Sequence, residues 1–489
     1  MNKKILIGID FILVFAAYVG FMTFSFGGDT LSHIMNPLVN IEAWRTYGRY
    51  LAFALGEAML HFGVSATDIY KPSWLILVVL IAITIFLFQL TFEELFEKEL
   101  ESKTFKILFI CITLIALING LVCEFFMFPE AFINFGLAFL LSGIATFSFA
   151  KNKKVIALVA AICASMFYQT SLITIAIILV AYMYIENDCV IELDLFKKEF
   201  LVVMIIGLIG VINIISSKVL YMMGIVVDET RSASVSDFGN KLYLIAHDFW
   251  KILQSGKGLM PGIYIPLIMM ILPLVFVVIY GVTNQDMLSI ADYIIVQIVE
   301  IVLVLSLSIV QNNNSGLIPR LVFNFYTMQM CMILIAVKIC ISEEVVVKVF
   351  TVAAFGYVLI QLLSCEMISQ NRRVSNILDI TYAQEVMQEI HKYEEESGIK
   401  VKYIVSYVDT NYANSYENVY YKTDQINERT LGLTSYSLLE YVNGEATEFE
   451  KGEYDNAVYE EYFEGKNWDE FNPDEQLVFI GDTLHWIAF

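Results

Sequence analysis

Residues 155–185 read VIALVAAICASMFYQTSLITIAIILVAYMYI, an apolar run interrupted by the polar segment Tyr168-Gln169-Thr170-Ser171. A hydrocarbon core of roughly 30 Å takes about 20 apolar residues per helix, so the run is long for one span. Read as a single tilted helix, it would reverse the orientation of every later span. Lysine pairs at 153–154 and 197–198 favour the same side of the membrane. The sequence therefore predicts two short helices that meet at the polar segment on the outer side.

Comparable apolar runs occupy most of residues 1–368 and are too long and continuous for barrel strands. Because lipid leaves only helices or closed barrels as spanning structures, the runs predict a polytopic α-helical membrane protein. Lysines in the short loops indicate a cytoplasmic N-terminus and an outer C-terminus. The spans, about eleven, are predicted at 5–26, 73–92, 105–123, 131–150, 155–167, 171–185, 200–219, 263–281, 290–310, 321–341 and 346–367.

The last part of the chain differs in composition from the rest. The 489 residues are 58% hydrophobic with a net charge of −21, and residues 371–489 carry −15 of it, from 24 Asp and Glu against 9 Lys and Arg. No basic field of the kind that binds nucleic acid is present. A helical pattern over 372–396, ended by Gly398, and strand patterns at 399–408 and 476–480 predict a small extracytoplasmic α/β domain over 369–489.

Two predicted outer loops, 27–72 and 219–262, are long, whereas the predicted inner loops are short. In the first of them apolar residues recur at steps of three and four, which is typical of helices that lie along the membrane interface. The length of these loops indicates that the working surface of the 1–368 region faces outward.

Three acidic residues lie where predicted spans meet outer loops. Asp29 follows the first span in Gly27-Gly28-Asp29-Thr30, and Glu124 and Glu130 flank the segment 125–129, FFMFP. Carboxylates at the membrane boundary tend to have a role, and one of them can serve as the general base for an acceptor hydroxyl. The same pattern also fits ordinary helix caps, with Asp29 at the start of an interfacial helix.

Basic residues at the same side supply candidates for phosphate binding. Arg320 follows Pro319 directly before a predicted span, and a guanidinium binds phosphate in bidentate fashion. An interfacial anchor is the alternative reading. Arg45, Arg49 and Lys218 are further candidates.

Two other motifs fail on spacing. Residues 254–258, QSGKG, lack the Gly-x4-Gly-Lys-Ser/Thr pattern of a phosphate-binding loop, and His247-Asp248 has the wrong spacing for two metal ligands on a helix. Without a nucleotide site, an enzyme at the outer surface needs another source of activated sugar, and a carrier-lipid phosphate can supply one.

The motifs resemble those of a known family. Gly28-Asp29 followed by residues 43–50, AWRTYGRY, looks like the first outer loop of the bacterial type II glucosyltransferases, the Gtr type II family that modifies O-antigen. The polar segment 168–171, the loop from Glu124 to Glu130, and Pro319-Arg320 at the entry of a span are similar too. The likeness covers roughly residues 1–370 in layout.

The resemblance implies a membrane glycosyltransferase of the GT-C type. Such a hexosyltransferase moves a sugar, here expected to be glucose, from a polyprenyl phosphate to a surface polysaccharide outside the bacterial cytoplasmic membrane. Family members often carry paired acids where this chain has Gly28-Asp29. One carboxylate is a poor site for Mg²⁺ or Mn²⁺, so the resemblance does not decide whether the enzyme needs a divalent cation. The implied roles are general base for Asp29, second acid for Glu124 or Glu130, donor phosphate binding for Arg320, Arg49, Arg45 and Lys218, and substrate lining for Trp44, Tyr168 and Gln169.

A transporter or flippase for a lipid-linked or charged solute is the alternative function. Transporters usually show paired repeats and broken helices at the membrane midplane. Here the charged candidates lie at the outer boundary, which favours an enzyme.

Overall fold

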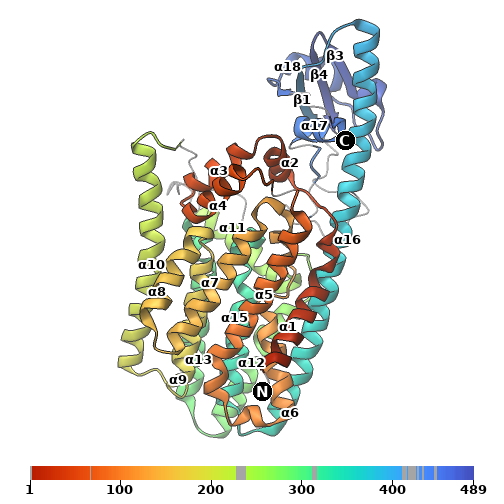
Figure 1. Ribbon diagram of the computed structural model, residues 1–489. Helices are drawn as coiled ribbons and strands as arrows, with labels where there is room; N and C mark the ends of the chain where they lie inside the picture. Colours follow the sequence, from red (N-terminus) through yellow and green to blue (C-terminus); the bar gives the residue numbers. More distant parts are fainter. Residues whose placement is uncertain are drawn as a thin grey trace. The chain divides into compact units, whose positions relative to one another are not determined.

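The computed structural model describes residues 3–65, 68–226, 238–310, 317–409, 416, 426, 429–431, 434–444 and 449–488. This described part is mostly helical and carries a small mixed sheet (Figure 1). It divides into two compact units. The first comprises Met1–Met22, Ile41–Phe126 and Ala131–Met367, and the second Thr23–Asn40, Met127–Glu130 and Ile368–Phe489.

The first unit contains helices whose length and composition suit a membrane. Its helices are α1 (Lys3–Tyr18), α4 (Tyr50–His61), α5 (Tyr70–Phe92), α6 (Lys103–Ile115), α7 (Phe132–Ala150), α8 (Lys154–Phe167), α9 (Ser171–Glu186), α10 (Leu193–Met222), α11 (Phe238–Ser255), α12 (Ile265–Thr283), α13 (Met287–Val310), α14 (Pro319–Val322) and α15 (Asn324–Ile339), with the start of α16 (Glu344–Ser397). Helix α3 (Pro37–Thr46) crosses the boundary between the units. Residues 227–237 of the predicted loop 219–262 lie outside the described residues.

Within the described residues, eight helices are long and apolar enough to cross a membrane. Two shorter apolar helices, α8 and α9, add to them. The chain therefore has the candidate spans of a multi-pass membrane protein. Close packing holds these helices together, as between α5 and α7, where a Cβ at Gly136 would lie 2.8 Å from Leu80 Cδ1. Small residues at such contacts let helix backbones approach each other.

The polar segment in the run 155–185 separates two helices, as predicted. Helix α8 ends at Phe167, and α9 begins at Ser171. In contrast, the helix expected over 105–123 ends at Ile115. The Asn119 amide donates to the carbonyls of Ile115 and Ala116 at 3.3 and 3.2 Å, and its oxygen accepts from the Val122 amide at 3.1 Å. An asparagine side chain that takes over main-chain groups in this way competes with the helix.

The predicted span 346–367 and the predicted helix 372–396 are one continuous helix, α16, of 54 residues. Residues 368–371, ISQN, contain neither proline nor glycine, so nothing stops the helix there. Helix α16 ends before Gly398, as predicted, where a φ of +74° suits glycine.

The second unit contains a four-stranded mixed sheet. Its strands are β1 (Tyr403–Val408), β2 (Glu450–Lys451), β3 (Leu477–Ile480) and β4 (Thr483–Ala488), in the order β2-β1-β4-β3. Strand β1 is parallel to β2 and β4, and β3 is antiparallel to β4. The predicted strands correspond to β1 and β3, whereas β2 and β4 were not predicted. The unit also contains α2 (Gly28–Met35), α17 (Ser435–Asn443), α18 (Asn456–Val458) and α19 (Pro473–Gln476).

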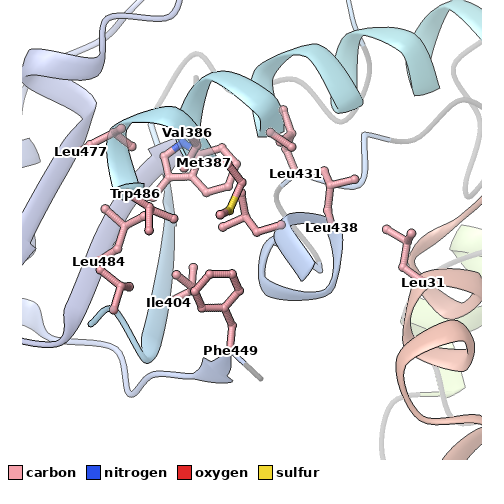
Figure 2. Close-up of a cluster of buried hydrophobic side chains, with 14 of the residues drawn as sticks. Leu31, Val386, Met387, Ile404, Leu431, Leu438, Phe449, Leu477, Leu484 and Trp486 are labelled. Atoms are coloured by element: carbon pink, nitrogen blue, oxygen red, sulfur yellow. The ribbon is translucent and has the colours of Figure 1, made fainter. Parts of the chain in front are cut away.

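One apolar cluster joins the sheet, α16 and α2 (Figure 2). Val386, Met387 and Ile390 present one face of α16, at helical spacing, to Leu484 and Trp486 of β4. Leu31 of α2 is fully buried in the same cluster. The segment after the first predicted span thus shares a core with the C-terminal part of the chain.

Candidate functional site

A buried ion pair joins two of the predicted site residues in the first unit. Glu124 lies in a 3-10 segment, Val122–Met127, with a side chain that is 0% exposed, and Arg320 lies in the first turn of α14. The Arg320 main-chain N–H donates to Glu124 Oε2 at 2.6 Å, and its guanidinium pairs with Glu124 Oε1. A carboxylate taken out of water needs such a partner, because an uncompensated buried charge is strongly destabilising. Glu124 therefore fixes both the backbone and the side chain of Arg320.

Tyr168 lies beside this pair, in the turn between α8 and α9. Its side chain is buried, and its hydroxyl donates to the Arg320 carbonyl at 3.5 Å. The ring meets Phe125 and Phe135 edge to face, with centroids 5.6 and 5.2 Å apart. Burial raises the pKa of the Tyr168 hydroxyl, and the guanidinium groups of Arg320 and Arg49 oppose that shift. The neutral phenol is therefore a stable hydrogen-bond donor here.

Arg49 covers the other side of Tyr168. Its guanidinium carbon lies 4.7 Å from the centre of the Tyr168 ring, a distance at which a cation is attracted to the π face. Arg49 Nε donates to Gln169 Oε1 at 3.3 Å, and Gln169 Nε2 donates to the Tyr47 carbonyl at 2.5 Å. The residues before α4 are thus tied to the turn before α9. We call Arg49, Glu124, Tyr168, Gln169 and Arg320 the arginine cluster.

The backbone turn that presents Arg49 requires a glycine. Gly48 has a φ of +75°, and a Cβ there would collide with Asn213 Oδ1 and lie 2.9 Å from Ser217 Oγ, both on α10. Tyr50, on the other side of Arg49, contacts Ser216 of α10 through its hydroxyl at 2.5 Å. Helix α10 therefore holds the Tyr47–Tyr50 turn in place.

A second polar contact fixes the chain just before Arg320. The Leu317 main-chain N–H donates to Asp248 Oδ2 at 2.9 Å, and Lys257 donates to the Leu317 carbonyl. Lys257 Nζ also lies 3.6 Å from Asp248 Oδ2. Asp248 and Lys257 therefore position the entry to α14. Sequence reasoning missed both residues, because 254–258 and His247-Asp248 were judged only as nucleotide and metal motifs.

Three further predicted residues of the first unit make other contacts. Arg45 pairs with Glu42 at 2.5 Å and donates to the Ile225 carbonyl at 2.9 Å. Lys218 is an exposed side chain on α10. Trp44 is 9% exposed and packs against α4, where a Cβ at Gly56 would lie 2.9 Å from its ring.

The two other predicted acids belong to the second unit. Asp29 lies in the first turn of α2. The neighbouring Thr30 hydroxyl donates to Glu130 Oε2 at 3.0 Å and also lies 3.3 Å from the Met127 carbonyl. The Asp29 carboxylate acts electrostatically on Glu130. The two acids are therefore neighbours.

The described residues contain no group of three or more His, Cys, Asp or Glu side chains that could hold a metal ion. Asp29 and Glu130 supply two carboxylates, which is fewer than the ligands of a dedicated Mg²⁺ or Mn²⁺ cage.

Comparisons of the chain with protein-family models, with curated proteins and with solved structures found no match. The class that the fold defines is a mostly helical protein with eight candidate membrane spans and a small C-terminal mixed sheet.

Proposed function

We propose that this chain is a membrane glycosyltransferase that moves a sugar, glucose in the first instance, from a polyprenyl phosphate to a cell-surface polysaccharide. One observation supports the proposal most. In a helical unit rich in candidate spans, the Arg49 guanidinium lies over the Tyr168 ring and the Tyr168 hydroxyl donates to the Arg320 carbonyl. The guanidinium groups of Arg49 and Arg320 both act electrostatically on that hydroxyl. Of the five side chains of the arginine cluster, two are cationic and one is anionic, so the cluster itself favours an anion.

A lipid phosphate is the anion that suits this setting. Arginine binds phosphate through paired N–H groups, and positive charge stabilises the phosphate as it leaves the sugar. Arg320 has the firmer support, because Glu124 holds its backbone and side chain together. We therefore assign Glu124 a positioning role rather than that of a base. Arg49, held over Tyr168, supplies the second guanidinium, and Gln169 orients it.

Asp29 is the proposed general base. The bond between the anomeric carbon and the phosphate oxygen breaks, a bond from that carbon to the acceptor hydroxyl oxygen forms, and the hydroxyl proton passes to the Asp29 carboxylate. Attack from the face opposite the phosphate inverts the anomeric centre. Glu130, held by Thr30, is the second acid beside Asp29.

The other predicted residues and the predicted location complete the proposal. Arg45 and Lys218 attract the phosphate headgroup of the donor. Trp44, Tyr168 and Gln169 line the substrate-binding site. The protein belongs to the bacterial cytoplasmic membrane, with a GT-C-like arrangement of about eleven spans, its N-terminus in the cytoplasm and residues 369–489 outside. The length and apolar character of the helices support placement in a membrane.

The test is a transfer assay with purified protein in detergent, a polyprenyl-phosphate glucose donor and a cell-wall polysaccharide acceptor. We expect Asp29→Asn and Arg320→Lys to lower transfer at least about tenfold each, as for the loss of a catalytic base or an electrostatic contact. The matched control is Lys348→Ala, because Lys348 is an exposed residue that forms an ion pair with Glu344 one turn earlier on the same helix. Unchanged transfer in both variants would defeat the assignment. Solute flux without sugar transfer would favour the transporter or flippase.

A further inference from the structure

Helix α13 contains an acid that the proposed function does not use. Glu300 is 0% exposed, and among the described residues neither of its carboxylate oxygens has a hydrogen-bond partner. An ionised carboxylate in such surroundings is very unfavourable, so the group binds a cation or carries a proton instead. Ionisable residues inside membrane helices are rare and tend to have a role.

Other polar groups near Glu300 have unsatisfied hydrogen-bonding atoms as well. Gln297 lies three residues earlier on the same face of α13, is 7% exposed, and has no partner for Nε2 within the described chain. Both Gln297 and Glu300 interact with the side chain of Tyr293. Tyr184 of α9 interacts electrostatically with Glu199 and Tyr293; it is fully buried, and its hydroxyl has no partner among the described residues either. Gln297 Nε2 and the Glu300 carboxylate thus leave a donor and an acceptor unpaired within one turn of α13. Such unpaired groups indicate that a bound proton or other ligand compensates the acid.

The charges around Glu300 do not neutralise it. Glu199 of α10 acts on it electrostatically and, being an acid, disfavours a second negative charge. Cys331 of α15 and Tyr293 are the other titratable groups that interact with Glu300. Lys338 of α15 donates its ammonium group to the Leu95 carbonyl at 2.8 Å. The titratable groups found to interact with Glu300 in the described part of the chain are therefore neutral or acidic.

A proton fits this environment better than a metal ion. No described group of three or more His, Cys, Asp or Glu side chains could hold a metal ion, whereas a proton needs only one oxygen. Glu300 is fully buried whereas Glu199 is partly exposed, so Glu300 is the more strongly desolvated of the two acids and the one on which we place the proton.

We propose that Glu300 is an intramembrane proton-binding site, in which the carboxylate takes up one proton from water and holds it at neutral pH beside Glu199 and Gln297. The proton removes the negative charge that these buried surroundings do not solvate. This site is independent of the proposed sugar transfer.

Infrared spectroscopy of the full chain in lipid nanodiscs tests the proposal, because a protonated carboxylic acid has its own carbonyl-stretch band. Asp10 of α1 is a second buried acid, with one oxygen 3.0 Å from Gln89 Nε2, so the band of Glu300 is obtained by difference. We expect Glu300→Gln to remove one carboxylic-acid equivalent per chain at pH 7. The matched control, Glu192→Gln, changes an exposed acid before α10 and should leave the band intact.

Two results would overturn the proposal. One is a wild-type spectrum at pH 7 that Glu300→Gln leaves unchanged, which would mean that Glu300 is ionised. The other is loss of the band when choline chloride is replaced by sodium chloride, which would make the site a sodium site. Should Glu300→Gln not fold, isotopically labelled glutamate in the unmutated protein separates the glutamate bands from that of Asp10. The band must then shift with the label, and a band that does not shift contradicts the proposal.

Discussion

The first unit contains two fully buried glutamates, and their surroundings differ. Glu124 accepts from the backbone and the guanidinium of Arg320, whereas Glu300 has no hydrogen-bond partner among the described residues. Water is excluded from both carboxylates, so each must be compensated. Glu124 keeps its charge because the Arg320 guanidinium lies beside it. We infer that Glu300 is neutralised by a proton. The comparison separates a carboxylate that organises an anion site from one that stores a proton.

Removing the cation from the first glutamate should have the largest effect. Arg320→Ala leaves Glu124 buried and uncompensated, and we expect the free energy of unfolding to fall by about 3–5 kcal/mol. Denaturation of the detergent-solubilised protein measures the change. The control is the double variant Glu124→Gln/Arg320→Ala, which should recover part of the loss because no unpaired charge remains. A double variant as unstable as Arg320→Ala would show that the two residues do not compensate each other.

A buried histidine of the second unit extends the comparison to a group that is neutralised by losing a proton. His33 of α2 is 4% exposed, and burial lowers its pKa to about 4 from 6.5. Between these pH values the unfolded chain binds more protons than the folded one. The stabilising contribution of His33 is therefore complete above pH 6.5 and is lost as the pH falls toward 4, by up to about 3 kcal/mol.

Hydrogen exchange of the α2 amides at pH 7 and pH 5 checks this prediction. Protection should fall in the wild type, and it should fall less in His33→Gln, which has no proton to gain. An equal fall in both proteins would assign the pH dependence to other groups.

Asp248, which holds the backbone just before Arg320, is expected to contribute less to stability than the Glu124–Arg320 pair. Asp248→Asn removes the charge that faces Lys257 and weakens the bond to the Leu317 amide, so we expect a loss of about 1–3 kcal/mol in stability. Sugar transfer should also decrease, since the entry to α14 is less well held. Lys251→Ala is the control, because Lys251 Nζ lies 3.9 Å from Asp248 Oδ1 and its side chain is 51% exposed. Equal losses in both variants would remove the positioning role of Asp248.

The smallest effect is expected at the second guanidinium. Arg49→Lys retains the charge but loses the planar contact with Tyr168 and the bond to Gln169, worth about 0.5–1 kcal/mol at a partly exposed site. The apparent KM for the polyprenyl-phosphate donor should rise more than kcat falls. Arg45→Lys, which changes an arginine paired with Glu42, should have a smaller effect on that KM. The reverse order would move the phosphate site toward Arg45.

Local patterns in the sequence predicted the apolar helices well. Lysine positions predicted that two helices lie on either side of residues 168–170. Gly398 predicted the end of α16. The early end of α6 depends on hydrogen bonds of the Asn119 side chain, which periodicity does not reveal. Strand β4 was not predicted, although its pairing with β1 forms the centre of the sheet.

The candidate site was predictable as a set of residues but not as an arrangement. Residue type and position singled out Arg320 and Glu124. Their contact joins residues 196 positions apart, so no local sequence pattern predicts it. Asp248 and Lys257 act through the backbone of Leu317, a role without a sequence motif. Glu300 can be recognised in the sequence as one acid in an apolar run. That the described residues give it no hydrogen-bond partner depends on how the helices pack, which the sequence does not show.

The most direct test of the central claim, that the arginine cluster binds a lipid phosphate, is a comparison of two lipids by native mass spectrometry. The purified chain is titrated with a polyprenyl phosphate and with the corresponding neutral polyprenol. The account predicts tighter binding of the phosphate by the wild type, and loss of that preference in Glu124→Gln/Arg320→Gln, which keeps two neutral amides in place of the ion pair. Equal binding of both lipids by the wild type, or a preference that survives in the double variant, would contradict it.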